Sequence, residues 1–86
     1  MKKEFVSVIV KFNEIGNKTP LSIIWNNGKI YEIDKVIAVK NRASMKVGGI
    51  GERYEIRINN NTTYLFFEDG KWFVEQKKWW INHHLN

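Results

Sequence analysis

The sequence predicts a small all-β domain, and three observations support this prediction. Short runs rich in β-branched and aromatic residues alternate apolar with polar side chains, as strands with one buried face do. Residues that favour turns separate these runs at short intervals. The 86 residues suffice for one domain, and because the chain contains no cysteine, its core depends on apolar packing alone. Four Trp, three Tyr and five Phe residues supply much of the apolar surface for such a core.

The range 20–33 is expected to form a β-hairpin around which the rest of the domain is arranged. Asn27-Gly28 separates two apolar runs, and both residues tolerate the positive φ angles of a two-residue type I′ turn. The predicted apolar face of the first arm carries Leu21, Ile23 and Trp25, opposite Ser22. The predicted apolar face of the second arm carries Tyr31 and Ile33, opposite Glu32 and Asp34. A single hairpin is not stable in water, so other strands must cover these faces.

Four further runs are predicted to be strands. They are Phe5–Phe12, Glu52–Asn59, Thr63–Phe67 and Lys71–Glu75. In the first run Val6, Val8, Val10 and Phe12 share one face, and in the second Tyr54, Ile56 and Ile58 face inward while Arg53, Glu55 and Arg57 face outward. The second hairpin arm continues to Arg42, with a bulge or bend at Asp34-Lys35 where the alternation changes phase. Turns are expected at 59–62 and at Asp69-Gly70.

The six predicted strands favour a single small antiparallel, partly open barrel, because a curled sheet limits its exposed edges. The barrel domain is assigned to residues 1–78, and residues 79–86 are assigned to a C-terminal cap or tail. Two alternatives stay open for the range 76–86, namely a short helical turn that caps the barrel and a loosely ordered tail. The adjacent Trp79 and Trp80 favour the cap, because two exposed indoles are costly in water.

The chain carries a formal net charge of +5, from 14 Lys and Arg residues against 9 Asp and Glu residues. This balance favours an acidic partner, such as nucleic acid, anionic lipid or an acidic protein surface. An AT-rich coding bias is the alternative explanation, since Lys, Ile and Asn are abundant and only three arginines occur. No apolar run approaches the ~20 residues of a membrane helix, so we expect a soluble cytoplasmic protein without membrane contact.

Support for catalysis in the sequence is weak. None of the three serines has a histidine nearby in the chain, and both histidines, His83 and His84, lie in the terminal segment. Glu32 and Asp34 project from one strand face, as a pair for acid–base chemistry would, but any solvated strand face does the same. Without cysteines or a second histidine cluster, a metal site has no ligand set. We therefore expect no enzymatic activity, no metal and no cofactor.

The segment Ala43–Gly51 is the longest stretch without periodicity and is expected to be a loop. Its glycines would leave backbone N–H groups exposed beside cations, and such a nest binds phosphate or another anion. The residues assigned to this anion or nucleic-acid site are Arg42, Ser44, Lys46, Gly48, Gly49, Gly51, Arg53 and Arg57. The alternative is a flexible or bulged connection between two halves of the barrel. The segment matches no known nucleotide-binding loop.

Basic and aromatic residues also interleave along several predicted strands, Lys40, Arg53 and Tyr64 among them. Small barrels bind single strands by stacking bases on exposed rings over a basic groove. Because a small domain needs most of its rings for its core, we expect few exposed rings. The residues assigned to a stacking or partner surface are Trp25, Tyr31, Trp79 and Trp80.

Several stretches of the chain resemble a known family. They are 11–13, 20–25, 31–36, 48–54 and 64–75, and the resemblance as a whole covers nearly all of the chain up to Glu75. They are similar to a group of small uncharacterised bacterial domains with SH3-like barrels, some of whose more distant relatives accompany translesion DNA polymerases. The resemblance implies an SH3-like barrel and a bacterial origin, and it favours a nucleic-acid role. It carries over no catalytic residue.

The function expected from the sequence is a non-catalytic binding module. The first hypothesis is nucleic-acid binding through the basic glycine loop. The second is a protein–protein or homodimer contact through exposed aromatics and the Trp79-Trp80 segment. A small-molecule or polyanion site at the glycine loop is the third.

Overall fold

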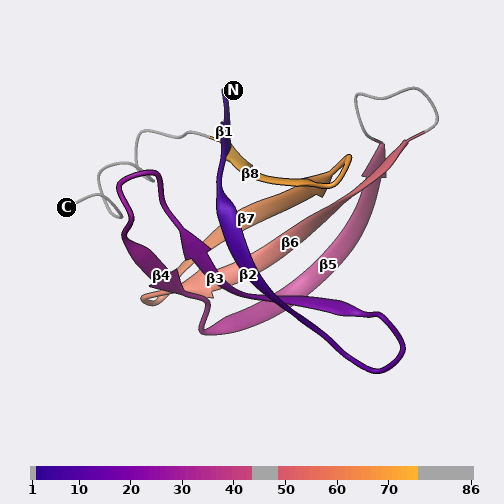
Figure 1. Cartoon of the computed structure of the whole chain (residues 1–86), viewed down its shortest axis with the longest axis horizontal. Coiled ribbons are helices and arrows are strands. Elements are labelled where there is room, and N and C mark those ends of the chain that lie inside the picture. The colour runs from indigo at the N-terminus through magenta and orange to yellow at the C-terminus, as the bar shows by residue number, and fades with distance from the viewer. Residues whose placement is uncertain (1, 44–48, 76–86) are drawn as a thin grey trace.

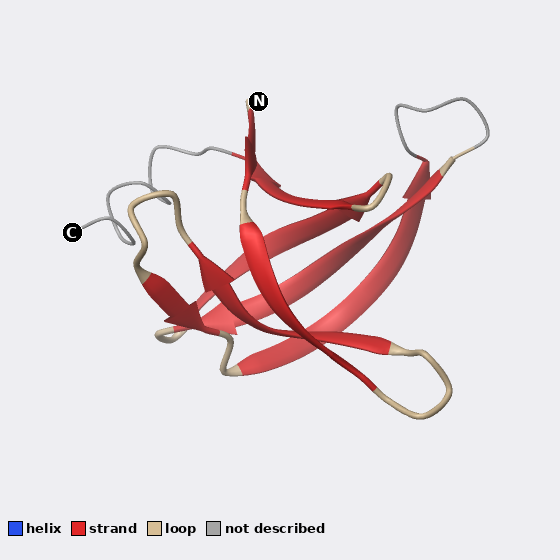
Figure 2. Ribbon diagram, in the orientation of Figure 1, coloured by secondary structure: helices blue, strands red, loops and turns tan. Residues whose placement is uncertain are grey.

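The computed structural model describes residues 2–43 and 49–75, and every regular element within these ranges is a β-strand (Figures 1 and 2). The strands are β1 (Lys3–Phe5), β2 (Ser7–Phe12), β3 (Lys18–Ile24), β4 (Ile30–Glu32), β5 (Lys35–Ala43), β6 (Ile50–Ile58), β7 (Asn61–Glu68) and β8 (Lys71–Glu75). The all-β prediction is confirmed. A search of the same ranges for a helix long and apolar enough to cross a membrane found none.

The strands form two antiparallel sheets. The larger sheet has the order β1-β8-β7-β6-β5, and the smaller has the order β2-β3-β4 (Figure 1). The expected six-stranded, partly open barrel is not confirmed, since the described ranges contain eight strands in two sheets that do not close into a barrel. The predicted strand Phe5–Phe12 is divided into β1 and β2, and the predicted second hairpin arm is divided into β4 and β5. At each division the chain crosses from one sheet to the other. The 76–86 segment, for which a cap or tail was predicted, lies outside the described residues.

The two splits lie at Val6 and at Ile33-Asp34. The backbone N–H of Val6 donates to the carbonyl of Trp72 at 3.1 Å. After Val6 the chain no longer pairs with β8 and enters β2 of the smaller sheet. The backbone N–H of Asp34 donates to the carbonyl of Arg57 at 2.9 Å, and the Asp34 carboxylate accepts the Asn59 N–H at 3.0 Å. The predicted bend at Asp34-Lys35 is therefore confirmed as a corner between the sheets.

The turn of the β3–β4 hairpin differs from the prediction. The Trp25 N–H donates to the Lys29 carbonyl at 2.8 Å, so three residues connect the paired positions instead of two. Gly28 has a φ of 86°, whereas Asn27 is not among the residues with positive φ. This pattern is a type I turn followed by a glycine in the left-handed region, not a type I′ turn. The predicted turns after β6 and β7 are present, with positive φ at Asn59-Asn60 and at Asp69-Gly70.

The predicted burial of Ile23 and Trp25 is confirmed, but the side-chain phase differs from the prediction earlier in β3. Ser22 is buried and Leu21 is exposed, the reverse of the expected pattern. The pairing with β2 passes from Ile9–Ser22 directly to Val10–Pro20, so Leu21 is an extra, bulged residue. The bulge shifts the alternation by one position. On β2 the expected alternation holds as far as Val10, but Phe12 at its end is exposed.

One apolar layer between the two sheets forms the core. The smaller sheet and its turn contribute Ile23, Trp25 and Tyr31, and the larger sheet contributes Tyr54, Ile56, Ile58, Leu65 and Val74. The predicted inward face of the 52–59 strand is thus confirmed. Because these side chains fill the space between the sheets, the opposite face of the larger sheet is turned away from the core.

Replacing Ile56 by valine is expected to lower the free energy of unfolding by about 0.5–1.5 kcal/mol, because the fully buried side chain loses one methylene. Ile37→Val is the matched control, since Ile37 is 39% exposed and Ile56 is 0% exposed. For the control we expect a change below about 0.5 kcal/mol. Urea unfolding of both variants measures the difference. An equal loss at the two positions would contradict the assignment of the core.

Candidate functional site

The outer face of β5 and β6 carries a group of cations. Directly paired residues of antiparallel strands project from the same face, and the register pairs Lys40 with Arg53 and Lys35 with Arg57. Arg42 lies on this face too, because it pairs with Gly51, two positions before Arg53. We call this surface the basic face, and it consists of Lys35, Lys40, Arg42, Arg53 and Arg57.

Two of these pairings place like charges directly opposite one another. Lys40 faces Arg53, and Lys35 faces Arg57, across neighbouring strands. Such pairs destabilise a sheet relative to neutral or opposite-charge pairs. Glu55, which pairs with Ala38, is the carboxylate residue that the described part of β5 and β6 places on this face. Within the described ranges, no ion pair compensates any of the five cations. In the described part of β5 and β6, the basic face therefore carries five cations and one carboxylate and is net positive.

Two arginines of the basic face lie over aromatic rings of β7. The Arg42 guanidinium carbon is 4.8 Å from the centroid of the Phe66 ring, and that of Arg53 is 4.7 Å from the centroid of the Tyr64 ring. Arg42 is on β5 and Phe66 is on β7, so the Arg42 side chain crosses β6. Gly51, the pairing partner of Arg42 on the intervening strand, has no side chain.

Gly51 has a structural role rather than the loop role expected for it. It lies in β6, and the strands extend to Ala43 and from Ile50, so the predicted loop is shorter than Ala43–Gly51. A Cβ at Gly51 would be 3.1 Å from the Phe67 carbonyl oxygen, so the neighbouring strand also approaches closely here. Gly49 is described and precedes β6. Ser44, Lys46 and Gly48 lie outside the described residues, so the proposed nest is not described.

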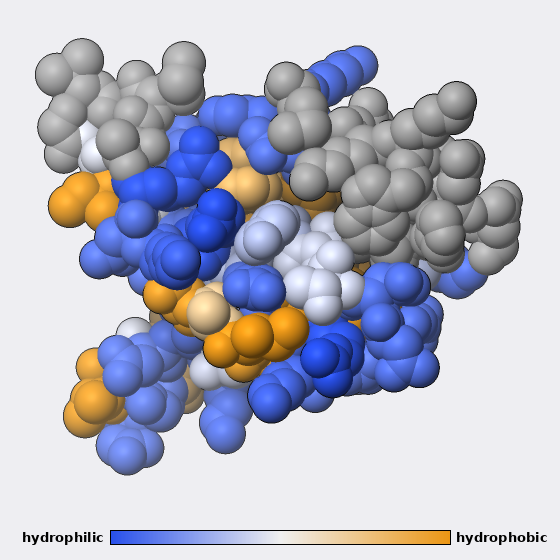
Figure 3. All heavy atoms as spheres, turned by 180° about the vertical axis from the view of Figure 1, so that it is seen from behind, coloured by the Kyte–Doolittle hydropathy of each residue, from blue (hydrophilic) through white to orange (hydrophobic). Residues whose placement is uncertain are grey.

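Three cations of the basic face converge on a shallow depression. It is lined by Lys40, Asn41, Arg42 and Arg53 and has a volume of about 310 Å³. The larger sheet lies at the back of the view in Figure 1, and Figure 3 shows the molecule from this side, where hydrophilic residues occupy much of the coloured surface and apolar areas lie among them. Two guanidinium groups and one ammonium group at one depression suit the oxygens of a phosphate.

The predicted stacking surface is wrong for two of its residues. Trp25 is 6% exposed and Tyr31 is 5% exposed, and both belong to the core. Their rings make an edge-on contact with centroids 6.5 Å apart. Both face the larger sheet, so neither ring offers a surface for a nucleic-acid base. Trp79 and Trp80 lie outside the described residues.

A second polar cluster joins the two sheets at the inner face. Lys18 Nζ lies 2.7 Å from Glu52 Oε1 and 4.5 Å from the centroid of the Phe67 ring. The Tyr54 hydroxyl donates to the same Glu52 oxygen at 2.9 Å. Burial raises the pKa of Tyr54 above its ordinary value of 10.0, and the hydrogen bond and the negative charge of Glu52 raise it further. The cluster thus connects β3 to β6 and has a structural function.

The carboxylates considered for acid–base chemistry do not form a pair. The Asp34 carboxylate accepts the backbone N–H of Asn59 at the corner between the sheets, whereas Glu32 is exposed on β4. In residues 2–43 and 49–75, no group of three or more His, Cys, Asp or Glu side chains is arranged to hold a metal ion. Asp34 therefore has a structural partner in the fold.

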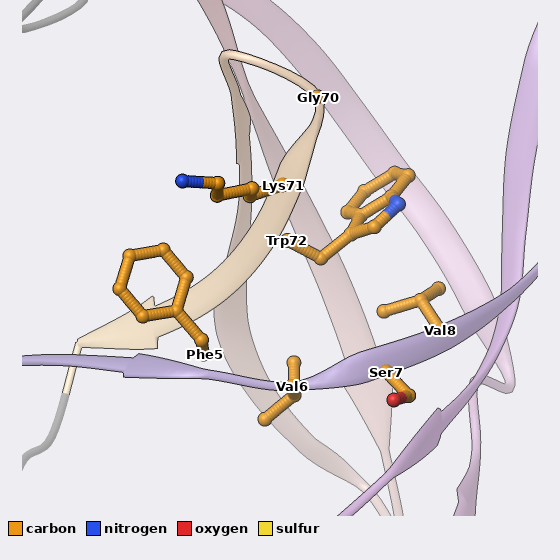
Figure 4. A pocket seen from close by; sticks show the side chains of 7 residues that line it. All are labelled: Phe5, Val6, Ser7, Val8, Gly70, Lys71 and Trp72. Atoms are coloured by element: carbon orange, nitrogen blue, oxygen red, sulfur yellow. The ribbon is translucent and has the colours of Figure 1, made fainter.

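An apolar groove opens after β1, where β2 diverges from β8. It has a volume of about 470 Å³ and is lined by Phe5, Val6, Ser7, Val8, Gly70, Lys71 and Trp72. In Figure 4 the Trp72 indole points towards Val8, and Lys71 extends on the side of Phe5. Its lining has one hydroxyl and one ammonium group and no carboxylate or imidazole. The groove has space for an apolar group but lacks an acid–base pair.

Comparison of the chain with protein-family models, with curated proteins and with solved structures found no match. The site therefore rests on geometry alone. Sequence reasoning found Arg42, Arg53 and Arg57, and the alternation of 52–59 placed two of them correctly on the outer face. It named Lys40 and Tyr64 only among the basic and aromatic residues that interleave along the strands, and it did not name Lys35 or Phe66 for the site. The pairing of β5 with β6 places the two lysines beside the arginines. A bulge between Val36 and Ala38 shifts this pairing by one residue, so counting positions along the sequence does not give the pairing.

The raised pKa of Tyr54 predicts a loss of stability in alkali. The folded state favours the neutral phenol. The contribution of this phenol to the free energy of unfolding is therefore fully present below pH about 10 and is lost as the pH rises above this value. The Tyr54→Phe variant has no phenol to ionise at this position. Its free energy of unfolding should therefore decrease less than that of the native protein between pH about 9 and about 11. Urea unfolding of both proteins at the two pH values provides the measurement. Equal decreases would contradict the assigned environment of Tyr54.

Proposed function

We propose that the protein is a small non-catalytic nucleic-acid-binding module that uses its basic face. The observation that supports the proposal best is the direct pairing of like charges, Lys40 with Arg53 and Lys35 with Arg57. Each pair costs stability in the free protein, and a bound polyanion removes this cost. A surface selected only for stability would place carboxylates opposite these cations.

Two further features support this function. The net charge of +5 attracts a polyanion at long range, and the depression among Lys40, Arg42 and Arg53 provides a local contact for a phosphate. The proposal also agrees with the resemblance to SH3-like domains whose distant relatives accompany DNA polymerases. We propose that the two sheets are an open form of such a barrel, in a protein of the bacterial cytoplasm.

A protein partner is the second candidate function. The apolar groove beside Phe5 and Trp72 favours it, since Phe5 is 53% exposed at the rim. An exposed apolar groove is a feature of protein interaction sites. Binding of a protein or of a second copy at this groove would change little with salt, whereas binding at the basic face would weaken strongly.

The double variant Arg42→Ala/Arg53→Ala is expected to bind single-stranded DNA and RNA more weakly than the native protein. Five phosphate contacts would give a slope of log affinity against log salt of about −3.5 for a single strand, and each lost cation reduces it by about 0.7. The double variant should therefore show a slope of about −2.1. Fluorescence anisotropy at several salt concentrations measures both quantities.

The matched control is Lys11→Ala/Lys29→Ala, which removes the same charge from exposed positions on the smaller sheet and its turn. It tests whether net charge alone explains binding. If the two double variants lose the same affinity, the basic face is not the site. Absence of binding by the native protein at low salt, where electrostatic attraction is strongest, would contradict the proposed function itself.

A further inference from the structure

We infer that the basic face holds the sugar-phosphate backbone of its nucleic acid and makes no stacking contact with the bases. The inference rests on the proposed function and specifies its ligand chemistry. It follows from the positions of Tyr64 and Phe66, the rings nearest to the cations. Single-strand binding by small β-domains commonly uses such rings as stacking platforms. Here the arginines cover them.

Neither ring presents a free platform to a base. Phe66 is only 4% exposed, and it stacks on Phe73 with ring centroids 5.1 Å apart and planes 8° apart. Arg42 lies over the same Phe66 ring. Tyr64 is half-buried, and the Arg53 guanidinium occupies the position over its ring that a base would need. A base that stacked on the ring face beneath either arginine would have to displace that arginine.

The rings instead hold the arginines in place. A guanidinium that lies over a ring keeps its N–H groups available for hydrogen bonds, since the ring contact uses the charge and not the donors. Within the described part of the chain, no carboxylate forms an ion pair with Arg42 or Arg53. Their side chains are thus partly ordered before binding, which lowers the entropy lost when they contact a phosphate. Tyr64 and Phe66 act as positioning residues.

The depression itself also favours a phosphate over a base. Its lining consists of Lys40, Asn41, Arg42 and Arg53 and contains no aromatic ring. Charged donors of this kind match phosphate oxygens, and a base gains little from them without a stacking partner. The cation pair Lys35 and Arg57 lies further along the same strands.

The two groups of cations require a polymeric ligand. Arg53 and Arg57 are four residues apart on β6, which corresponds to about 13 Å along a strand. Glu55 lies between them on the same face and repels a phosphate at that position. A nucleoside monophosphate has a single phosphate and can satisfy only one of the two groups, whereas a continuous backbone can contact the cations on either side of Glu55. The ligand class is therefore a nucleic-acid strand recognised by its backbone, without preference for base sequence.

The test compares a fluorescent oligothymidylate with an abasic oligomer of the same length and number of phosphates, both titrated with the full chain at low salt. We expect affinities equal within about twofold, because the contribution of counterion release depends on phosphates and not on bases. The loss of even one base stack would weaken binding about fivefold or more. An abasic oligomer weaker by that factor overturns the inference and leaves the proposed function intact. If neither oligomer binds, the proposed function fails and the inference fails with it.

The variant Tyr64→Leu tests the positioning role of the ring. Removal of the support under Arg53 should weaken binding of both oligomers by the same factor. A loss confined to the oligomer with bases would mean that Tyr64 stacks on a base, and it would overturn the inference. Lys29→Ala is the control, since Lys29 lies over Tyr31 on the other sheet, and it should change neither affinity by more than the small effect of one remote charge. Urea unfolding verifies that the Tyr64→Leu protein is folded at the temperature of the titration.

Discussion

The rest of the structure depends on the burial of one apolar layer between the two sheets. Ile23 of the smaller sheet and Ile56 and Leu65 of the larger sheet are completely buried in it. Each such side chain contributes about 1.5–3 kcal/mol of transfer free energy, and neither sheet retains this contribution without the other. Because the strands of the larger sheet point alternate side chains into the layer, Arg53 and Arg57 must point away from it. The core therefore determines the position of the basic face.

The sequence predicted the fold well where strict alternation continues through a strand. Between Tyr54 and Ile58 every side chain has the predicted orientation, because β6 is regular and pairs on both sides. The prediction failed where the backbone departs from regular geometry. The bulge at Leu21 changes the side-chain phase of β3 before Ser22, and the extra residue in the Trp25–Lys29 connection changes the turn type. Both features depend on how a strand pairs with its neighbour. The alternation of apolar and polar residues along a single strand gives no information about that pairing.

The same limit explains what was and was not predicted at the site. Alternation along one strand was enough to place Arg53 on the outer face. It was not enough to show that Lys40 faces Arg53, or that Arg42 reaches Phe66 across β6, since these contacts join three strands. The glycines of this region suggested a phosphate nest from sequence alone. In the structure Gly51 instead lies in β6 and allows the close approach of the Phe67 carbonyl oxygen on the neighbouring strand.

The division of aromatic residues between core and outer face follows from the size of the domain. A chain of 86 residues buries a modest fraction of its surface, so it needs most of its rings for packing. Trp25 and Tyr31 lie in the core, which excludes them from binding. On the outer face, Phe66 is buried against Phe73 and still contacts Arg42. A single ring therefore stabilises the sheet and orders a cation at the same time. A domain with few rings to expose can in this way build a binding surface from arginines that its packed aromatics support.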